Sequence, residues 1–272
     1  MAHFFATPGE LVASLWRNRS LVLALIKRDI KGRYRGSFFG MFWSFLNPLL
    51  MLAVYTFVFS VVLKARWDIT SDSKTEFALI LFAGLLIFNI FSECINRSPG
   101  IILSNQNYVK KVVFPLEILP WVTLGASLFH GAVSLGVWLL AYIVLVGAPH
   151  STIFYLPVII VPLVFFIMGL SWILASLGVY LRDTAQFVSI MTTALMFISP
   201  IFYPATALPE NYRAFIYLNP LTTVIEQTRD ILFRGNPPEV IVSVSYLTAA
   251  IITAWVGFAI FQKTRKGFAD VL

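Results

Sequence analysis

Long apolar stretches dominate this sequence and leave little room for any fold except a bundle of membrane-crossing helices. A helix needs about 20 apolar residues to cross a bilayer. Of the 272 residues, 58% are hydrophobic and only 12% are charged. A single soluble core could not bury that much apolar surface. We therefore predict an all-α, polytopic membrane protein with no soluble domain. The six predicted spans cover approximately residues 38–63, 77–95, 116–146, 153–180, 185–203 and 240–261.

The distribution of Lys and Arg predicts how the chain is oriented. Counted over alternate connections, one side of the membrane carries fourteen Lys/Arg, including those of the N-terminus, and the other side carries six. The positive-inside rule then places both termini in the cytoplasm. The net charge of +7 lies beside apolar spans, which favours contact with membrane lipids over binding of nucleic acid. Nearly forty residues precede the first span, so we expect no cleavable signal peptide.

The segment before the first span, residues 1–37, is predicted to form an amphipathic interface helix. Thr7, Pro8 and Glu10 make a capping-box signature at its start. Apolar residues near one face and many basic residues are typical of a helix in the headgroup layer, although an ordinary solvated helix is the alternative.

The connection before the last span, residues 205–234, is predicted to contain two short helices. Apolar residues recur at helical spacing, Asn219-Pro220 signals a second helix start, and 235–238 (GNPP) ends it. We interpret the pair as re-entrant helices in the outer leaflet. The alternative is that they lie on the membrane surface.

Motifs for catalysis and cofactor binding are missing from the sequence. It has no His-Glu-x-x-His, no pair of cysteines, no Gly-x-Ser-x-Gly and no P-loop. We therefore predict no catalytic residues, no metal and no cofactor, and expect any ATP to be bound by another polypeptide. Glu93 and Glu117 lie near predicted cytoplasmic ends of spans, where we expect them to be hydrated or paired with a base such as Arg97.

Aromatic and other large apolar side chains gather in the first and fifth predicted spans. The ordinary interpretation is packing between helices or anchoring at the interface. The functional alternative is a pore lined by rings, on which sugars stack without strong contacts that would stop sliding. The candidate channel residues are Phe42, Trp43, Tyr55, Phe59, Phe187, Met191, Phe202 and Tyr203.

Five motifs together resemble a known family. They lie at 33–49 (Arg33-Tyr34-Arg35-Gly36-Ser37 through Pro48-Leu49), 113–120, 180–183, 199–204 with 218–220, and 267–270. In order and spacing they are similar to ABC-2-type permeases that export polysaccharides such as O-antigen, capsule or teichoic acid. Among these, the chain looks most like the O-antigen or lipopolysaccharide permease of a bacterial inner membrane.

This resemblance implies partners and a division of the chain. It implies a homodimer joined to two separate P-loop ATPase subunits, and a polysaccharide substrate linked to a lipid pyrophosphate. Residues 1–37 would form the interface helix, 38–261 the six-span domain and 262–272 a cytoplasmic tail, with a coupling segment at 97–113 and an outer gate at 205–234. We expect Arg33 and Arg35 to attract the lipid phosphate. The expected ATPase-docking residues are Arg97, Asn105, Lys110, Lys111, Arg182 and Asp183.

Three other functions remain alternatives. A glycan-processing membrane enzyme would need converging carboxylates or a histidine near one membrane face. A secondary transporter would need buried charge at mid-membrane. The same type of permease could also carry a drug or a simple lipid.

Overall fold

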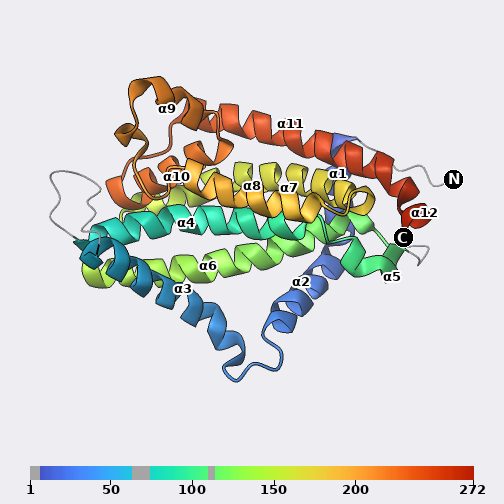
Figure 1. Ribbon diagram of the computed structural model, residues 1–272, viewed down its shortest axis with the longest axis horizontal. Helices are drawn as coiled ribbons and strands as arrows, with labels where there is room; N and C mark the ends of the chain where they lie inside the picture. Colours follow the sequence, from blue (N-terminus) through green and yellow to red (C-terminus); the bar gives the residue numbers. More distant parts are fainter. Residues whose placement is uncertain (1–6, 63–73, 110–113) are drawn as a thin grey trace.

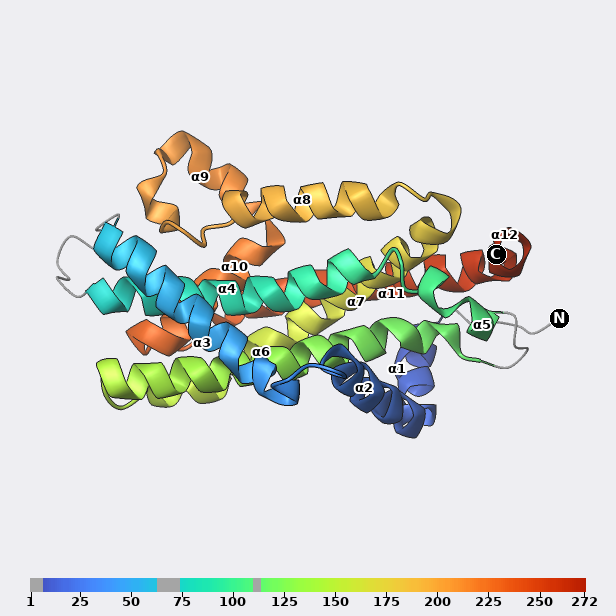
Figure 2. The same ribbon diagram turned by 60° about the horizontal axis from the view of Figure 1, so that its bottom comes forward.

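The computed structural model describes residues 7–62, 74–109 and 114–272, and within these ranges every regular element is a helix. The long helices lie side by side along the length of the molecule (Figures 1 and 2). The all-α architecture predicted from the sequence is therefore confirmed for the part of the chain that the structure describes.

Among the residues that the structure describes, five helical stretches are long and apolar enough to cross a membrane. The helices that form them are α3 (Trp43–Tyr55), which continues into a π-helical stretch at Thr56–Val62, α4 (Lys74–Arg97), α6 (Leu119–Leu145), α7 (Leu156–Tyr180) and α11 (Val240–Thr264). Each coincides with a predicted span to within a few residues.

The fifth predicted span forms a shorter helix than expected. Helix α8 covers Thr184–Ile198, which is 15 residues or about 22 Å at 1.5 Å per residue, against about 30 Å of hydrocarbon. It ends because Ser199 precedes a proline and adopts an extended backbone, with φ −67° and ψ 146°. The fifth predicted span is thus a short apolar helix, and its continuation to residue 203 is not helical.

The N-terminal segment forms two helices where the sequence predicted one. Helix α1 covers Pro8–Arg17 and α2 covers Arg19–Arg33, separated by Asn18. The capping prediction is confirmed, since the Glu10 backbone N–H donates to Thr7 Oγ1 at 3.3 Å. Asn18 caps the end of α1 by donating from Nδ2 to the Ser14 carbonyl oxygen at 2.8 Å, and this local hydrogen bond competes with a continuous helix.

The apolar face of α2 packs against protein. Val22 and Leu25 are buried against Ile118 and Val122 at the start of α6. Helices α2 and α3 form a V whose open side faces α6 (Figure 1). Residues from the end of α2, the loop after it and α3 line part of the cavity described below.

Helices α7 and α11 form the tightest contact in the bundle. A Cβ atom on Gly169 would clash with the Thr253 carbonyl, and one on Gly257 would clash with the backbone of Gly169. Small residues let helix backbones approach closely in membranes, where lipid tails supply no hydrophobic drive for association.

The connection before α11 contains the two predicted short helices, α9 (Glu210–Tyr217) and α10 (Pro220–Arg229). The expected cap is present, because the Leu221 N–H donates to Asn219 Oδ1 at 3.0 Å. Helix α10 is largely buried and packs on α4 and α7, whereas most side chains of α9 are exposed.

The two ends of the bundle carry different segments (Figures 1 and 2). Helices α1, α5 (Gln106–Val109) and α12 (Phe268–Val271) lie at one end, and α9 and α10 lie at the other. At the first end, Arg265 contacts Glu117 at 2.6 Å, and Ser14 Oγ donates to the same carboxylate at 2.9 Å. Glu117 is therefore paired, as expected, although its partner is a base of the C-terminal region.

Candidate functional site

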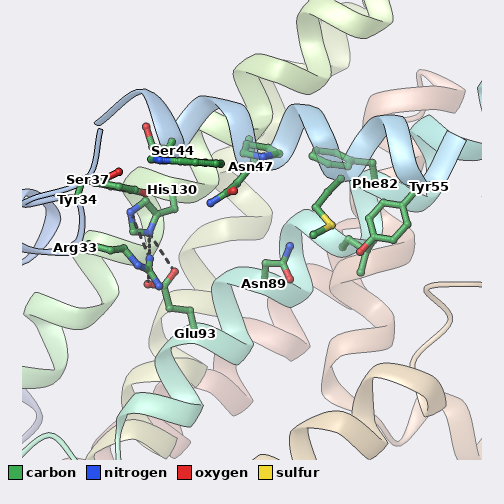
Figure 3. Close-up of a pocket in the computed structure, with 15 residues that line it drawn as sticks. Arg33, Tyr34, Ser37, Ser44, Asn47, Tyr55, Phe82, Asn89, Glu93 and His130 are labelled. Atoms are coloured by element: carbon green, nitrogen blue, oxygen red, sulfur yellow. Dashed lines mark hydrogen bonds and ion pairs between the residues drawn. The ribbon is translucent and has the colours of Figure 1, made fainter. Parts of the chain in front are cut away.

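A cavity of about 490 Å³ lies between α3, α4 and α6 and ends at the loop after α2 (Figure 3). Its lining combines charged, polar and aromatic side chains, which is unusual beside membrane-crossing helices. The residues are Arg33, Tyr34, Ser37, Trp43, Ser44, Asn47, Pro48, Met51, Tyr55, Phe82, Leu85, Asn89, Glu93, His130 and Ser134.

The charged end of the cavity is a cluster of three side chains from three helices. Arg33 Nη1 donates to Glu93 Oε1 at 2.7 Å and lies 2.7 Å from His130 Nδ1. The same Nδ1 lies 3.2 Å from Glu93 Oε2. Dashed lines mark these interactions in Figure 3. Tyr34 meets the His130 ring edge-on, and burial raises the pKa of its hydroxyl, so it stays a neutral hydrogen-bond donor.

Neighbouring ion pairs fix the position of this cluster. Both Arg97 amino nitrogens reach the Asp29 carboxylate, at 2.8 and 2.9 Å, which ties α2 to the end of α4. Arg97 also lies 3.7 Å from Glu93, one helical turn away. The prediction that Glu93 pairs with a base such as Arg97 is confirmed, but Arg33 is nearer. Arg97, expected to dock the ATPase, has its guanidinium engaged within the chain.

Neutral polar and aromatic groups line the rest of the cavity. Trp43, Asn47 and Tyr55 come from α3, and Asn89 comes from α4. Asn47 and Asn89 are exposed, and neither side-chain amide has a hydrogen-bond partner among the described residues. The structure therefore brings Arg33, Trp43 and Tyr55 of the predicted site into one cavity.

An aromatic run continues from the cavity toward the end that carries α9. The Tyr55 ring lies 6.5 Å from Phe59, which stacks on Phe202 at 6.0 Å, and Phe202 stacks on Phe197 at 5.7 Å. These contacts join predicted channel residues of the first span to one that follows the fifth span. Within one chain these ring contacts also pack helices together.

Four predicted residues meet in a second groove, of about 610 Å³, between α4, α7 and α8: Arg182, Asp183, Phe187 and Met191. Phe187 is 64% exposed and Met191 is 43% exposed, although both are large and apolar. This groove is separate from the charged cavity, so the structure does not unite the predicted channel residues in a single site within one chain.

The remaining predicted residues lie elsewhere. Phe42 is 54% exposed on η1 (Gly40–Phe42), and the Tyr203 hydroxyl donates to the Phe197 and Ile198 carbonyls. Arg35 belongs to a basic groove along α2, and Asn105 donates to the Ile101 carbonyl at 2.8 Å. Lys110 and Lys111 lie outside the described residues.

Sequence reasoning missed His130, Asn47 and Asn89 as cavity residues. A usable signal existed, because polar side chains inside apolar spans are costly and often functional. The positions of polar residues along the sequence do not show that α4 and α6 bring these side chains together.

Comparison with known proteins decides the family. The family model described as ABC-2 type transporter matches residues 20–233. The chain belongs to this family. This ABC-2 permease is 29% identical to the O-antigen export system permease protein RfbA of Myxococcus xanthus, over 96% of this chain and 98% of that protein. It is 30% identical to RfbA of Klebsiella pneumoniae, over 93% and 95%. It is 27% identical to the polysialic acid transport protein KpsM of Escherichia coli, over 90% and 93%.

Membership identifies the permease as a multi-pass membrane subunit of a transporter, without enzymatic chemistry of its own. The resemblance drawn from the sequence motifs is confirmed.

Proposed function

We propose that this ABC-2 permease is the membrane-spanning subunit of an ATP-driven exporter that moves lipid-linked polysaccharide, of the O-antigen class, across the bacterial inner membrane. The observation that carries the proposal is the similarity over nearly full length to two O-antigen export permeases. The cavity adds physical support, since it joins a charged end that contains Arg33 to aromatic and amide groups that suit phosphate and sugar.

The proposed transport unit is a homodimer with both termini in the cytoplasm and six spans per chain. Large apolar side chains of α3 and α8 are exposed, among them Leu50, Val54 and Ile190, so these helices need cover from lipid or a second copy. In a dimer, α3 and α8 would border the pore with the exposed Phe187 and Met191 on its wall. The glycan slides past rings that hold no single sugar tightly.

ATP is hydrolysed in this proposal by two separate P-loop subunits at the end that carries α5. Segment 97–113 and the Arg182-Asp183 turn are the proposed docking surface. Lys110 and Lys111 would contribute charge for an acidic ATPase surface or the lipid phosphate. Nucleotide binding shifts the permease between two conformational states only if the nucleotide-bound ATPase subunits have different affinities for those two states. Helices α9 and α10, in 205–234, are the proposed re-entrant outer gate.

A capsule polysaccharide is the second candidate cargo, supported by the similarity to the polysialic acid transport protein. A chemical analysis of the polysaccharide that a deletion strain retains distinguishes the two cargoes.

The proposal is tested by deleting the gene in its own organism and locating the polymer. We expect surface polysaccharide to disappear while lipid-linked polymer accumulates on the cytoplasmic side, and the intact gene to restore export. Unchanged surface polysaccharide in the deletion strain would refute the proposed function. Analysis of the sugars in the accumulated polymer identifies the cargo.

A further inference from the structure

Two unpartnered amide side chains mark the inner part of the cavity. Asn47 and Asn89 face it from helices that cross the membrane, and both are exposed to its interior (Figure 3). An amide offers two N–H donors and one carbonyl acceptor, all of which need partners in an apolar setting. A sugar ring supplies hydroxyl groups that both donate and accept, and the Trp43 indole in the same wall adds an apolar surface for its C–H face.

The charged end of the cavity contains a hydrogen-bonding conflict. His130 Nδ1 lies 2.7 Å from an Arg33 donor and 3.2 Å from a Glu93 acceptor. A ring nitrogen either carries a proton or presents a lone pair, so it satisfies only one of these neighbours at a time. An added anionic group at Arg33 would let the ring donate to it, and would remove the conflict.

Glu93 has an alternative partner if it leaves Arg33. Its Oε1 atom lies 2.7 Å from Arg33 Nη1 and 3.7 Å from Arg97 Nη1. Arg97 is one turn further along α4, so a small rotation of the carboxylate keeps it paired. Arg33 is 46% exposed at its side chain and can then receive another anion.

We propose that this cavity binds a glycosyl phosphate, with phosphoryl oxygens replacing the Glu93 carboxylate on Arg33 and His130 and with the first sugar hydrogen-bonded to Asn47 and Asn89. The inference rests on the proposed function and specifies where the substrate is recognised. Glu93 acts as the internal anion that holds the empty site together.

The dimensions suit such a ligand. Asn89 is one turn from Glu93 on the same face of α4, about 6 Å along the axis, so a phosphate and its attached sugar reach both positions. The volume of about 490 Å³ lies in the range of small-molecule sites. Arginine pairs well with phosphate because its N–H groups form two parallel hydrogen bonds. Glu93 lies about one helical turn from the end of α4 at Arg97.

Binding to the permease–ATPase complex in lipid nanodiscs tests the proposal. Three probes are compared by competition against a fluorescent lipid diphosphate: a short-chain polyprenyl diphosphate, the same lipid carrying one N-acetylhexosamine, and a soluble sugar phosphate. The first two isolate the contribution of the sugar. The third distinguishes a lipid-borne glycosyl phosphate from a free one.

Three variants are expected to change binding in different ways. Asn47→Ala with Asn89→Ala weakens the glycosylated lipid about tenfold, since each hydrogen bond contributes about 1 kcal/mol, and leaves the bare lipid unchanged. Arg33→Gln weakens both lipids by more than about tenfold, because a charged hydrogen bond is lost. Glu93→Gln tightens both about tenfold, because no carboxylate competes for Arg33. Asn236→Ala, at an exposed site outside the cavity, is the matched control and leaves binding unchanged.

The Glu93→Gln result separates the proposal from a purely structural ion pair. If Glu93 only held helices together, its loss would weaken binding, and that result would overturn the exchange of anions. Equal binding of the glycosylated lipid by the wild type and the double asparagine variant would overturn the sugar site. After either failure, the proposed exporter function is still supported if the wild-type complex exports polymer. A wild-type complex that does not export polymer would refute the function itself.

Discussion

Arg229 anchors α10 to the bundle, and replacing it should destabilise the protein strongly. The residue is 2% exposed. Its guanidinium donates to the Pro200 carbonyl, to the Ile201 carbonyl at 2.8 Å and to the Ile80 carbonyl at 3.3 Å, and it pairs with Glu226 at 3.1 Å. These bonds connect α10 with α4 and with the turn after α8, so the outer helices are held from both sides.

The expected cost follows from burial. Arg229→Met keeps most of the side-chain volume but takes away the Arg229 partner of the Glu226 carboxylate, whose side chain is only 20% exposed, and removes the Arg229 donor from three carbonyls. Breaking a buried ion pair from one side costs about 3–5 kcal/mol. For a chain of this size, about 2–4 °C per kcal/mol gives a fall of about 6–20 °C in the apparent unfolding midpoint.

The matched control is Arg234→Met in the same connection. Arg234 pairs with Asp230 at 2.6 Å, but the two side chains are 54% and 31% exposed, so this pair contributes less than about 1 kcal/mol. Thermal unfolding in nanodiscs, followed by accessibility of the buried Cys94 thiol, compares the two variants with the wild type. Equal midpoints for the two variants would refute the reasoning, whereas partial recovery on adding Glu226→Gln to Arg229→Met would support it.

Three further predictions concern packing, docking and the channel. Gly257→Ala should lower the unfolding midpoint by several degrees, because the new Cβ clashes with the Gly169 backbone. Gly136→Ala has open space around the new Cβ and should stabilise α6 by up to about 1 kcal/mol. Similar unfolding midpoints for the two variants would contradict the packing argument. Lys110→Glu with Lys111→Glu should weaken co-purification of the ATPase and reduce export, and normal assembly would remove support for docking at 97–113. Trp43→Ala, Tyr55→Ala and Phe187→Ala together should slow export several-fold without changing ATPase assembly, and normal export would remove support for an aromatic passage.

The long spans could be predicted from the sequence because lipid imposes a simple physical requirement. A helix that crosses must be apolar over about 20 residues, and this property is local. The caps at Thr7 and Asn219 were predictable for the same reason, since each uses a hydrogen bond within a few residues of the chain.

The assembled site was only partly predictable. Arg33 was expected at the site from the resemblance carried by the motif at 33–49, but its partners Glu93 and His130 lie 60 and 97 residues away. Contacts over such separations depend on how helices rotate and pack, which hydropathy does not encode. The break at Asn18 was missed because one side chain's hydrogen bond decided between one helix and two.

Proteoliposomes that contain the purified permease, with and without its separately purified ATPase, show which polypeptide supplies the energy for transport. The prediction is that the permease alone hydrolyses no ATP, and that the complex moves lipid-linked polysaccharide to a protected compartment only when ATP is supplied. ATP hydrolysis by the permease alone, or ATP-driven transport without the second polypeptide, would contradict it.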